Sequence, residues 1–251
     1  MKYIITLLCF AWLQVSWSPA YGQNDISEVK DSVEQEKKIR FLALPIITYA
    51  PETRLRFGAS ALMYFRVGDR SDKNTQLSTI RFPVTYTLER QFKIRLSYDI
   101  FLDQNKHIFT GFQEWFKFPL LFWGIGANTP DGNEELFTTQ AFAFNANYLN
   151  RISEKIYVGV GYDLRLSDVI EVDPDGQLST DGLVPGAKGG TTAGINLIVR
   201  RDDRDNNLSA SKGSYVQAIM GIYNEFIGSD FNYGFLQIDF RKYWAILQER
   251  H

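Results

Sequence analysis

Apolar and polar residues alternate strictly over long stretches of this chain from residue 39 onward. In residues 92–100, five apolar side chains fall on one face of an extended strand, while Lys93, Arg95 and Asp99 fall on the other. The same two-residue period recurs in residues 55–66, 156–166, 195–200 and 236–241. This period predicts about ten strands, near 40–48, 54–67, 77–88, 92–103, 107–117, 136–150, 155–169, 191–203, 213–226 and 231–246.

The predicted strands and their connections are typical of a transmembrane antiparallel β-barrel. The strands are longer than the five or six residues common in soluble sheets. Short connections at 50–53, 89–91 and 153–154 contrast with long polar ones at 68–76 and 170–190, as expected for periplasmic turns and external loops. Aromatic residues gather near predicted strand ends, where interfacial girdles lie in such barrels: Tyr64 with Phe65, Trp115 with Phe116, Phe122 with Trp123, and Tyr243 with Trp244. We therefore predict an all-β fold that forms an outer-membrane barrel.

A secreted soluble β-sandwich is the alternative fold. Its strands also alternate, because each of two stacked sheets buries one apolar face and exposes the other face to water. Strand length, the contrast between short and long connections, and the aromatic content favour the barrel. The sequence alone leaves both folds open.

In a barrel, the polar side of each strand would face the lumen. Opposite charges can pair there, and water can solvate the remaining charges. The residues predicted to line this lumen are Arg56, Arg66, Lys93, Arg95, Asp99, Asp163, Arg165, Arg200, Asp239 and Arg241. Because a barrel of few strands has little free interior, we interpret them as interior ion-pair packing in preference to a conduit for ions or polymers.

The N-terminus has the zones of a secretory signal peptide. Lys2 precedes an apolar run from Tyr3 to Val15, and small residues lead to a predicted cleavage after Gly22. The single cysteine, Cys9, lies inside this run, so the exported chain would contain no disulfide. We predict a signal peptide at 1–22, a polar lead at 23–38, and the barrel domain at 39–251, located in the outer membrane.

Composition and motifs argue against enzymatic or cofactor chemistry. Lys+Arg total 27 and Asp+Glu total 29, a net charge of -2 that provides no basic field for nucleic acid. Only His107 and His251 are present, too few for a histidine-based metal site, and no serine stands in a nucleophile motif. Asp173, Asp175 and Asp181 lack the spacing and the terminal glutamate of a calcium loop, so we interpret them as loop turns. We predict no enzyme activity, no cofactor and no metal.

Two segments resemble the BamA/TamA superfamily of outer-membrane barrels, also called bacterial surface antigens. The first is a charged turn in which an Asp-x-Arg-Asp-Asn run precedes a small residue, a Lys and a Gly: Asp202, Arg204, Asp205, Asn206 and Gly213 match it. The family often has proline where Ala210 or Ser211 stands. The second segment, Phe122 to Thr129, resembles an aromatic-Gly-Ile-Gly element of the same family. The resemblance implies a Gram-negative outer-membrane protein that inserts or translocates proteins or lipids.

The chain departs from that family in two places. Residues 23–38 leave no room for the periplasmic modules that usually receive substrates, and the Arg-Gly-aromatic tip of the family's lumenal loop does not occur. Family members close with sixteen strands and a terminal aromatic residue, as the resemblance implies, so we expect a fragment of a larger barrel in preference to a reduced barrel. The expected partners are outer-membrane lipid and an unidentified protein or lipid substrate. A passive pore or structural barrel is the alternative function.

Overall fold

The computed structural model describes residues 39–50, 54–68, 75–126, 129–180, 183–207 and 209–244. These residues form one antiparallel sheet in which each strand pairs with the next in sequence. The strands are β1 (Ile39–Ala50), β2 (Arg54–Phe65), β3 (Ser78–Thr87), β4 (Phe92–Leu102), β5 (His107–Phe122), β6 (Glu135–Ser153), β7 (Ile156–Glu171), β8 (Gly189–Asp202), β9 (Gly213–Tyr223) and β10 (Tyr233–Tyr243). Two short 3₁₀ helices, η1 (Asp131–Asn133) and η2 (Glu225–Ile227), lie in connections. Among the described residues, no helix has the length and apolar character needed to cross a membrane.

The ten predicted strands are confirmed, and most boundaries agree within two or three residues. The clearest difference is β5, which continues to Phe122 where the alternation predicts an end near residue 117. Residues 118–122 are a continuous apolar run that contains Pro119, so periodicity gives no strand signal there. Pro119 is tolerated because β5 pairs with β4 only as far as Lys117, and beyond that point it has a single neighbour, β6.

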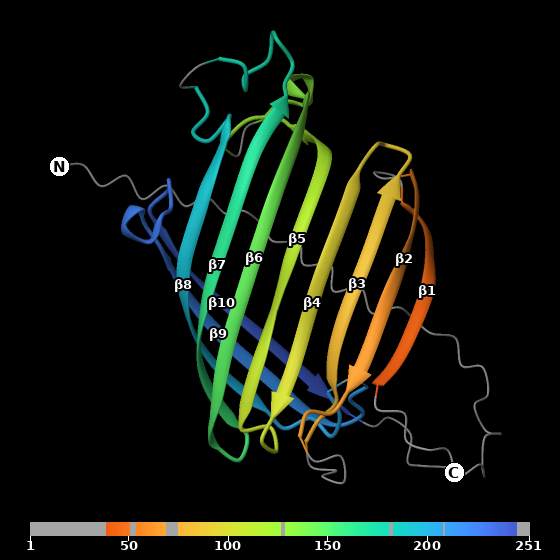
Figure 1. The fold of residues 1–251 in the computed structure, drawn as a ribbon. Coiled ribbons are helices and arrows are strands. Elements are labelled where there is room, and N and C mark those ends of the chain that lie inside the picture. The colour runs from red at the N-terminus through yellow and green to blue at the C-terminus, as the bar shows by residue number, and fades with distance from the viewer. Residues whose placement is uncertain are drawn as a thin grey trace. The chain divides into compact units, whose positions relative to one another are not determined.

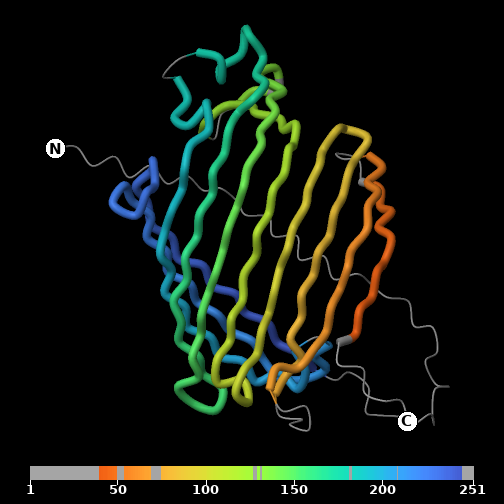
Figure 2. The backbone as a smooth tube through the Cα atoms, viewed as in Figure 1, coloured from red at the N-terminus to blue at the C-terminus, as the bar shows by residue number. Residues whose placement is uncertain are grey.

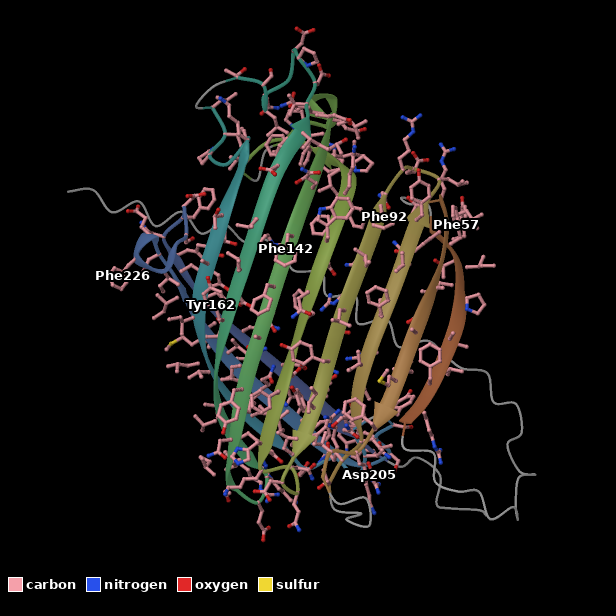
Figure 3. All side chains as sticks on the ribbon, in the orientation of Figure 1. Phe57, Phe92, Phe142, Tyr162, Asp205 and Phe226 are labelled. Atoms are coloured by element: carbon pink, nitrogen blue, oxygen red, sulfur yellow. The ribbon has the colours of Figure 1, made fainter. Side chains whose placement is uncertain are left out.

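The register places a continuous apolar surface on one face of the sheet. Phe142 of β6 lies opposite Trp115 of β5 on one side and Leu166 of β7 on the other, and the same matching extends across all ten strands. Figure 3 shows Phe57, Phe92, Phe142 and Tyr162 among the side chains of these strands. Exposed hydrophobic residues on this face include one from each strand in turn: Ile47, Phe57, Phe82, Leu96, Trp115, Phe142, Val160, Leu197, Met220 and Leu236.

The sheet is strongly curved, and β9 and β10 turn behind the plane of β4–β7 (Figures 1 and 2). The polar positions of the strands lie on the concave face. A small apolar core occupies this face near the β4–β5 and β6–β7 turns, where Phe101, Ile108, Leu149, Tyr157 and Ile198 are buried together. The apolar face is therefore the convex one.

Close packing on the concave face depends on glycine at particular positions. The ring of Tyr223 in β9 lies against Gly194 in the adjacent strand β8, where an added Cβ would come within 2.6 Å of three ring atoms. A side chain at this position would displace the ring, so glycine allows an aromatic residue to lie flat across the neighbouring strand.

The sheet is not closed. Within the described residues, β1 pairs only with β2 and β10 pairs only with β9, so each presents an edge with unpaired backbone groups. The described strands also contain no second sheet that could cover the convex face, so the two-sheet sandwich is not the observed architecture. The structure supports the all-β, antiparallel part of the predicted fold, while closure into a membrane barrel stays a prediction.

The predicted separation of short turns from long loops is wrong. Successive connections of an antiparallel sheet alternate between its two ends, so the short connections at 50–53 and 88–91 share an end with the long loop at 172–188. The tight β6–β7 turn lies at the other end with the long connections at 66–77 and 203–212. Connection length alone could not assign a connection to an end of the sheet. Two connections lie at the same end when an even number of strands separates them, whatever their lengths.

Two further predictions fall on residues that the structure does not describe. The signal peptide (1–22) and the polar lead (23–38) lie outside the described residues, although the first strand begins at Ile39, where the barrel domain was expected to start. His251 also lies outside them.

Candidate functional site

A hydrogen-bonded network crosses four strands on the concave face. Asp163 of β7 accepts hydrogen bonds from the Asn145 carboxamide of β6, from Asn196 Nδ2 of β8 at 2.6 Å, and from the Tyr223 hydroxyl of β9 at 2.6 Å. Asn147 Nδ2 donates to Asn145 Oδ1 at 2.6 Å and extends the network along β6. One carboxylate thus ties together four consecutive strands.

A second polar cluster joins β3, β4 and β5. The buried carboxylate of Glu114 accepts from Lys93 Nζ at 2.8 Å and from Arg95 Nη1 at 3.2 Å, and the Arg95 guanidinium also stacks 3.8 Å above the Phe112 ring. Asp99 pairs with Arg81 at 2.8 Å and accepts from Thr110 Oγ1 at 2.8 Å. Both cations contact Oε2 of this one buried carboxylate and compensate its charge, as burial of a charge requires.

The residues predicted to line a lumen share the concave face, except that Arg66 follows the last residue of β2. The structure brings Lys93 and Arg95 together at Glu114, and it brings Arg200 and Arg241 together over Tyr215, each 5.6 Å from the ring centre. Arg241 forms an ion pair with Asp239 at 2.6 Å. Arg56, Asp99, Asp163 and Arg165 lie in separate places on the same face, and the Arg165 guanidinium lies 5.7 Å from the Phe116 ring. The interpretation as interior packing is consistent with these contacts.

The turn that carries the family resemblance connects β8 to β9. Asp202 holds Arg204 through two hydrogen bonds, of 2.8 Å to Nε and 2.7 Å to Nη2, and the same guanidinium lies 4.7 Å above the Tyr215 ring. Asn206 Oδ1 accepts the backbone N–H of Ser209 at 3.2 Å. Each of these side chains therefore stabilises the turn conformation.

Asp205 and Gly213 complete that turn. Asp205 accepts the backbone N–H groups of Ser211 at 3.0 Å and Lys212 at 3.2 Å, together with the Ser211 hydroxyl. These hydrogen bonds lower the pKa of the Asp205 carboxyl from 3.8 to about 2, with Ser211 making the largest contribution. Gly213 has a φ of 107°, and a Cβ there would approach the Asp203 carbonyl oxygen to 2.4 Å, so the position requires glycine.

The second segment of the resemblance bends away from β5. Gly124 and Gly126 both have positive φ values, of 122° and 112°, in the segment that follows the end of β5 at Phe122. Ala127 and Asn128 lie outside the described residues. The ordinary role of these glycines is a change of chain direction.

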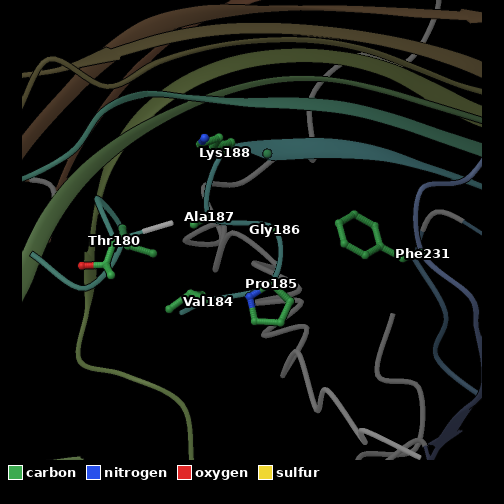
Figure 4. A pocket seen from close by; sticks show the side chains of 9 residues that line it. Thr180, Val184, Pro185, Gly186, Ala187, Lys188 and Phe231 are labelled. Carbon is green, nitrogen blue, oxygen red and sulfur yellow. The ribbon is translucent and has the colours of Figure 1, made fainter. Parts of the chain in front are cut away.

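The long connection between β7 and β8 is held by a buried glutamate. Glu135, at the start of β6 and only 4% exposed, accepts the backbone N–H of Gln177 at 2.8 Å and that of Leu178 at 3.3 Å. Phe231 of the β9–β10 loop packs near Gly186 of this connection and near Gly190 of β8. A hollow of about 350 Å³ lies there, lined mainly by Leu178, residues 184–189 and Phe231 (Figure 4).

Asp173 and His107 both have structural partners. Asp173 Oδ1 accepts the Asp175 backbone N–H at 3.1 Å and its carbonyl accepts Gly176 N–H at 3.0 Å, which makes a turn, while Asp181 lies outside the described residues. His107 Nδ1 lies 2.7 Å from the Tyr148 hydroxyl. In the parts of the chain that the structure describes, no three His, Cys, Asp or Glu residues are grouped to hold a metal ion.

Sequence reasoning missed the residues that organise these clusters. Glu114, Asn145 and Asn196 follow the polar phase of their strands, so the alternation places them on the correct face without revealing their partners. Tyr223 counts as apolar in a periodicity pattern, although its hydroxyl is polar. Glu135 had no distinguishing signal, because its neighbour Glu134 has the same side chain and is exposed.

Comparisons with known proteins found no match: no family model, no curated protein and no solved structure matches the chain. The similarity to the BamA/TamA superfamily therefore stays a prediction that depends on Asp202, Arg204, Asp205, Asn206, Gly213 and the segment from Phe122 to Thr129.

The Asp205 carboxylate is expected to titrate well below an ordinary aspartate. Its folded pKa of about 2 lies below the reference value of 3.8, so its stabilisation of the turn is complete above that reference value and is lost as the pH falls through 2. In ¹⁵N NMR spectra of the refolded protein, the amide shifts of Ser211 and Lys212 should titrate with a midpoint near pH 2. Asp205→Asn should abolish this titration, and a midpoint near 3.8 would contradict the prediction.

Removal of the Glu135 carboxylate is expected to release the β7–β8 connection. Hydrogen bonds to a charged group contribute about 1.5–3 kcal/mol, so Glu135→Ala should accelerate hydrogen exchange at Gln177 and Leu178 roughly tenfold or more. The matched control is Glu134→Ala, which removes an adjacent exposed carboxylate. Equal exchange in the two variants would mean that Glu135 does not hold the loop.

Proposed function

We propose that this chain is an integral outer-membrane protein whose convex face contacts hydrocarbon. The observation that carries the proposal is the uninterrupted exposure of apolar side chains across all ten strands. Soluble proteins rarely expose a contiguous apolar surface of this extent, because its hydration is unfavourable. In a bilayer the same surface is matched by lipid tails, and the hydrogen-bonded sheet satisfies most backbone groups.

The height of the apolar surface supports the same proposal. On β7, apolar side chains occupy the convex face from Ile156 to Leu166, and Asp168 follows on that face. Ten residue steps extend about 33 Å along a strand, which becomes about 25 Å across a membrane at the strand tilt of roughly 35–45° found in outer-membrane barrels. That is the height of the apolar band in such barrels.

The role we propose is insertion or translocation of proteins or lipids, as in the family that the β8–β9 turn resembles. The side chains of the concave face are tied to one another, as at Asp163 and Glu114, which favours activity elsewhere than through a wide water-filled lumen. The unpaired edges of β1 and β10 are positions where a further strand could add. The proposed activity would then be a local disturbance of the bilayer at these two edges, and no covalent bond would form or break.

A pair of adjacent residues on β10 tests the membrane contact. Leu236 is 67% exposed on the convex face, and its neighbour Gln237 is exposed on the concave face. Leu236→Lys should reduce the free energy of unfolding in phosphatidylcholine vesicles by about 2–4 kcal/mol near the bilayer midplane, while Gln237→Lys should change it by no more than about 0.5 kcal/mol. Urea unfolding followed by tryptophan fluorescence measures both, and equal small effects would favour a water-exposed convex face.

The proposed role is tested by co-reconstitution. Vesicles that contain the refolded protein should accelerate the folding of a second outer-membrane barrel protein, added in urea, relative to vesicles with an equal mass of a passive pore. A planar bilayer with the same preparation should lack a large steady ohmic current. No acceleration together with such a current would replace the insertion role with the passive-pore alternative.

A further inference from the structure

We propose that one border of the convex face binds the phosphate groups of anionic phospholipids. This border, here called the basic border, comprises Lys106, Lys155, Arg201 and Lys242 at the end of the sheet that carries the β4–β5 and β6–β7 turns. The inference rests on the proposed membrane contact and adds a lipid class and an orientation to it.

The four basic residues lie on neighbouring segments. The Lys106 carbonyl accepts the N–H of Arg151, two residues before the end of β6, and the Lys155 carbonyl accepts the N–H of Asp202, which ends β8. Arg201 lies opposite Ile156, directly beside Lys155, and Lys242 pairs with Ser214 of β9. The border therefore extends along the sheet from β5 to β10.

The basic side chains are exposed and adjoin the apolar surface. Arg201 follows Leu197 and Val199 on the convex face with a side chain 60% exposed, and Lys242 follows Ile238 and Phe240. On the same face beyond Lys242 lies Trp244, which is 73% exposed. Tryptophan next to lysine at the limit of an apolar band is the composition found at the headgroup level of membranes.

The carboxylates of the β8–β9 turn are engaged within that turn, whereas Asp103 and Glu154 of the β4–β5 and β6–β7 turns are exposed. Asp202 pairs with Arg204, Asp203 accepts the Ser214 hydroxyl at 2.7 Å, and Asp205 accepts the amides of Ser211 and Lys212. Asp203 also reaches a residue of the basic border, 3.6 Å from Arg201. The four cations of the border exceed the two exposed carboxylates of the neighbouring turns, so the border keeps a positive charge for an external anion.

The opposite end of the sheet carries mainly exposed carboxylates. Asp168 and Glu171 of β7 are exposed there. Glu134, Asp173 and Glu225 are exposed carboxylates of the adjoining connections. Lys117 also lies on the convex face near this end, but it is 3.8 Å from Glu171. Because cations predominate at the basic border and carboxylates at the opposite end, an anionic leaflet would select a single orientation of the sheet.

Phosphate is the fitting ligand because guanidinium and ammonium groups donate charge-assisted hydrogen bonds to its oxygens. Each lysine or arginine near an anionic surface strengthens binding about fivefold at moderate salt. The attraction should nearly vanish at 1 M salt, where the screening length falls to about 3 Å.

The test compares folding into phosphatidylcholine vesicles and into vesicles with one quarter phosphatidylglycerol. The wild-type chain should need less lipid for half-maximal folding when phosphatidylglycerol is present, and 1 M NaCl should remove the difference. The double variant Lys155→Gln/Lys242→Gln should lose this preference by up to roughly 25-fold, about fivefold for each side chain. The control Arg90→Gln/Lys188→Gln removes the same charge at the opposite end and should retain the preference.

The outcomes separate the two proposals. Failure of the wild-type chain to fold into either vesicle would overturn the membrane contact itself. Folding with equal efficiency into both vesicles, or a preference that survives in Lys155→Gln/Lys242→Gln, would overturn only the basic border. Loss of the preference in the control pair but not in the border pair would overturn it as well, because the anion site would then lie at the other end.

Discussion

The structure depends on one constraint, the two-residue alternation of side chains held in register across ten hydrogen-bonded strands. A slip of one residue between two strands would move apolar groups to the concave face and charges to the convex face. Register shifts occur in the β6–β7 pair, between Thr138 and Thr139 and between Arg151 and Ser153, close to the ends of β6. The middle of the sheet keeps a regular ladder, and the apolar surface is continuous there.

Because the same alternation places polar side chains together on the concave face, hydrogen bonds and ion pairs there link neighbouring strands. Asp163 reaches β6, β8 and β9, and Glu114 reaches two cations of β4. A carboxylate that loses any of these partners would be left partly unsatisfied away from bulk water, which is unfavourable. Curvature brings these side chains close together, and glycine at position 194 makes room for Tyr223 between them. Alternation, curvature and the polar networks are thus parts of one arrangement.

The sequence predicts the strands of this fold well because their signal is local. A period of two residues survives from Phe92 to Ile100 whatever the strand pairs with, so element type and face could be assigned from it. The end of β5 could not be predicted in this way, because residues Phe118–Phe122 are all apolar and show no alternation. The assignment of turns to ends failed for a different reason, because it compared connection lengths and not the number of predicted strands between the connections, which decides the end of the sheet.

In the candidate site, too, local properties could be predicted from the sequence and contacts between distant residues could not. That Asp163, Arg200 and Arg241 share a face is a local property and was predictable. That Asp163 meets Tyr223, sixty positions away in sequence, depends on the register of β7, β8 and β9, which places Gly194 between them, and register between strands leaves no periodic signal. Glu135 is the extreme case, because only the path of a distant loop distinguishes it from Glu134.

The central strands of the sheet are held by more contacts than the outer strands. The core of Phe101, Ile108, Leu149, Tyr157 and Ile198 joins β4 to β8, and the Asp163 network joins β6 to β9. These central strands are therefore fastened on both sides by pairing and by side chains. Among the strands that the structure describes, the outer strands β1 and β10 are each paired on one side only. Separation of an outer strand breaks one ladder, whereas opening the centre breaks two ladders and a polar network. Local opening of the sheet is thus energetically easiest at its edges, where the proposed function places the entry of strands or lipid.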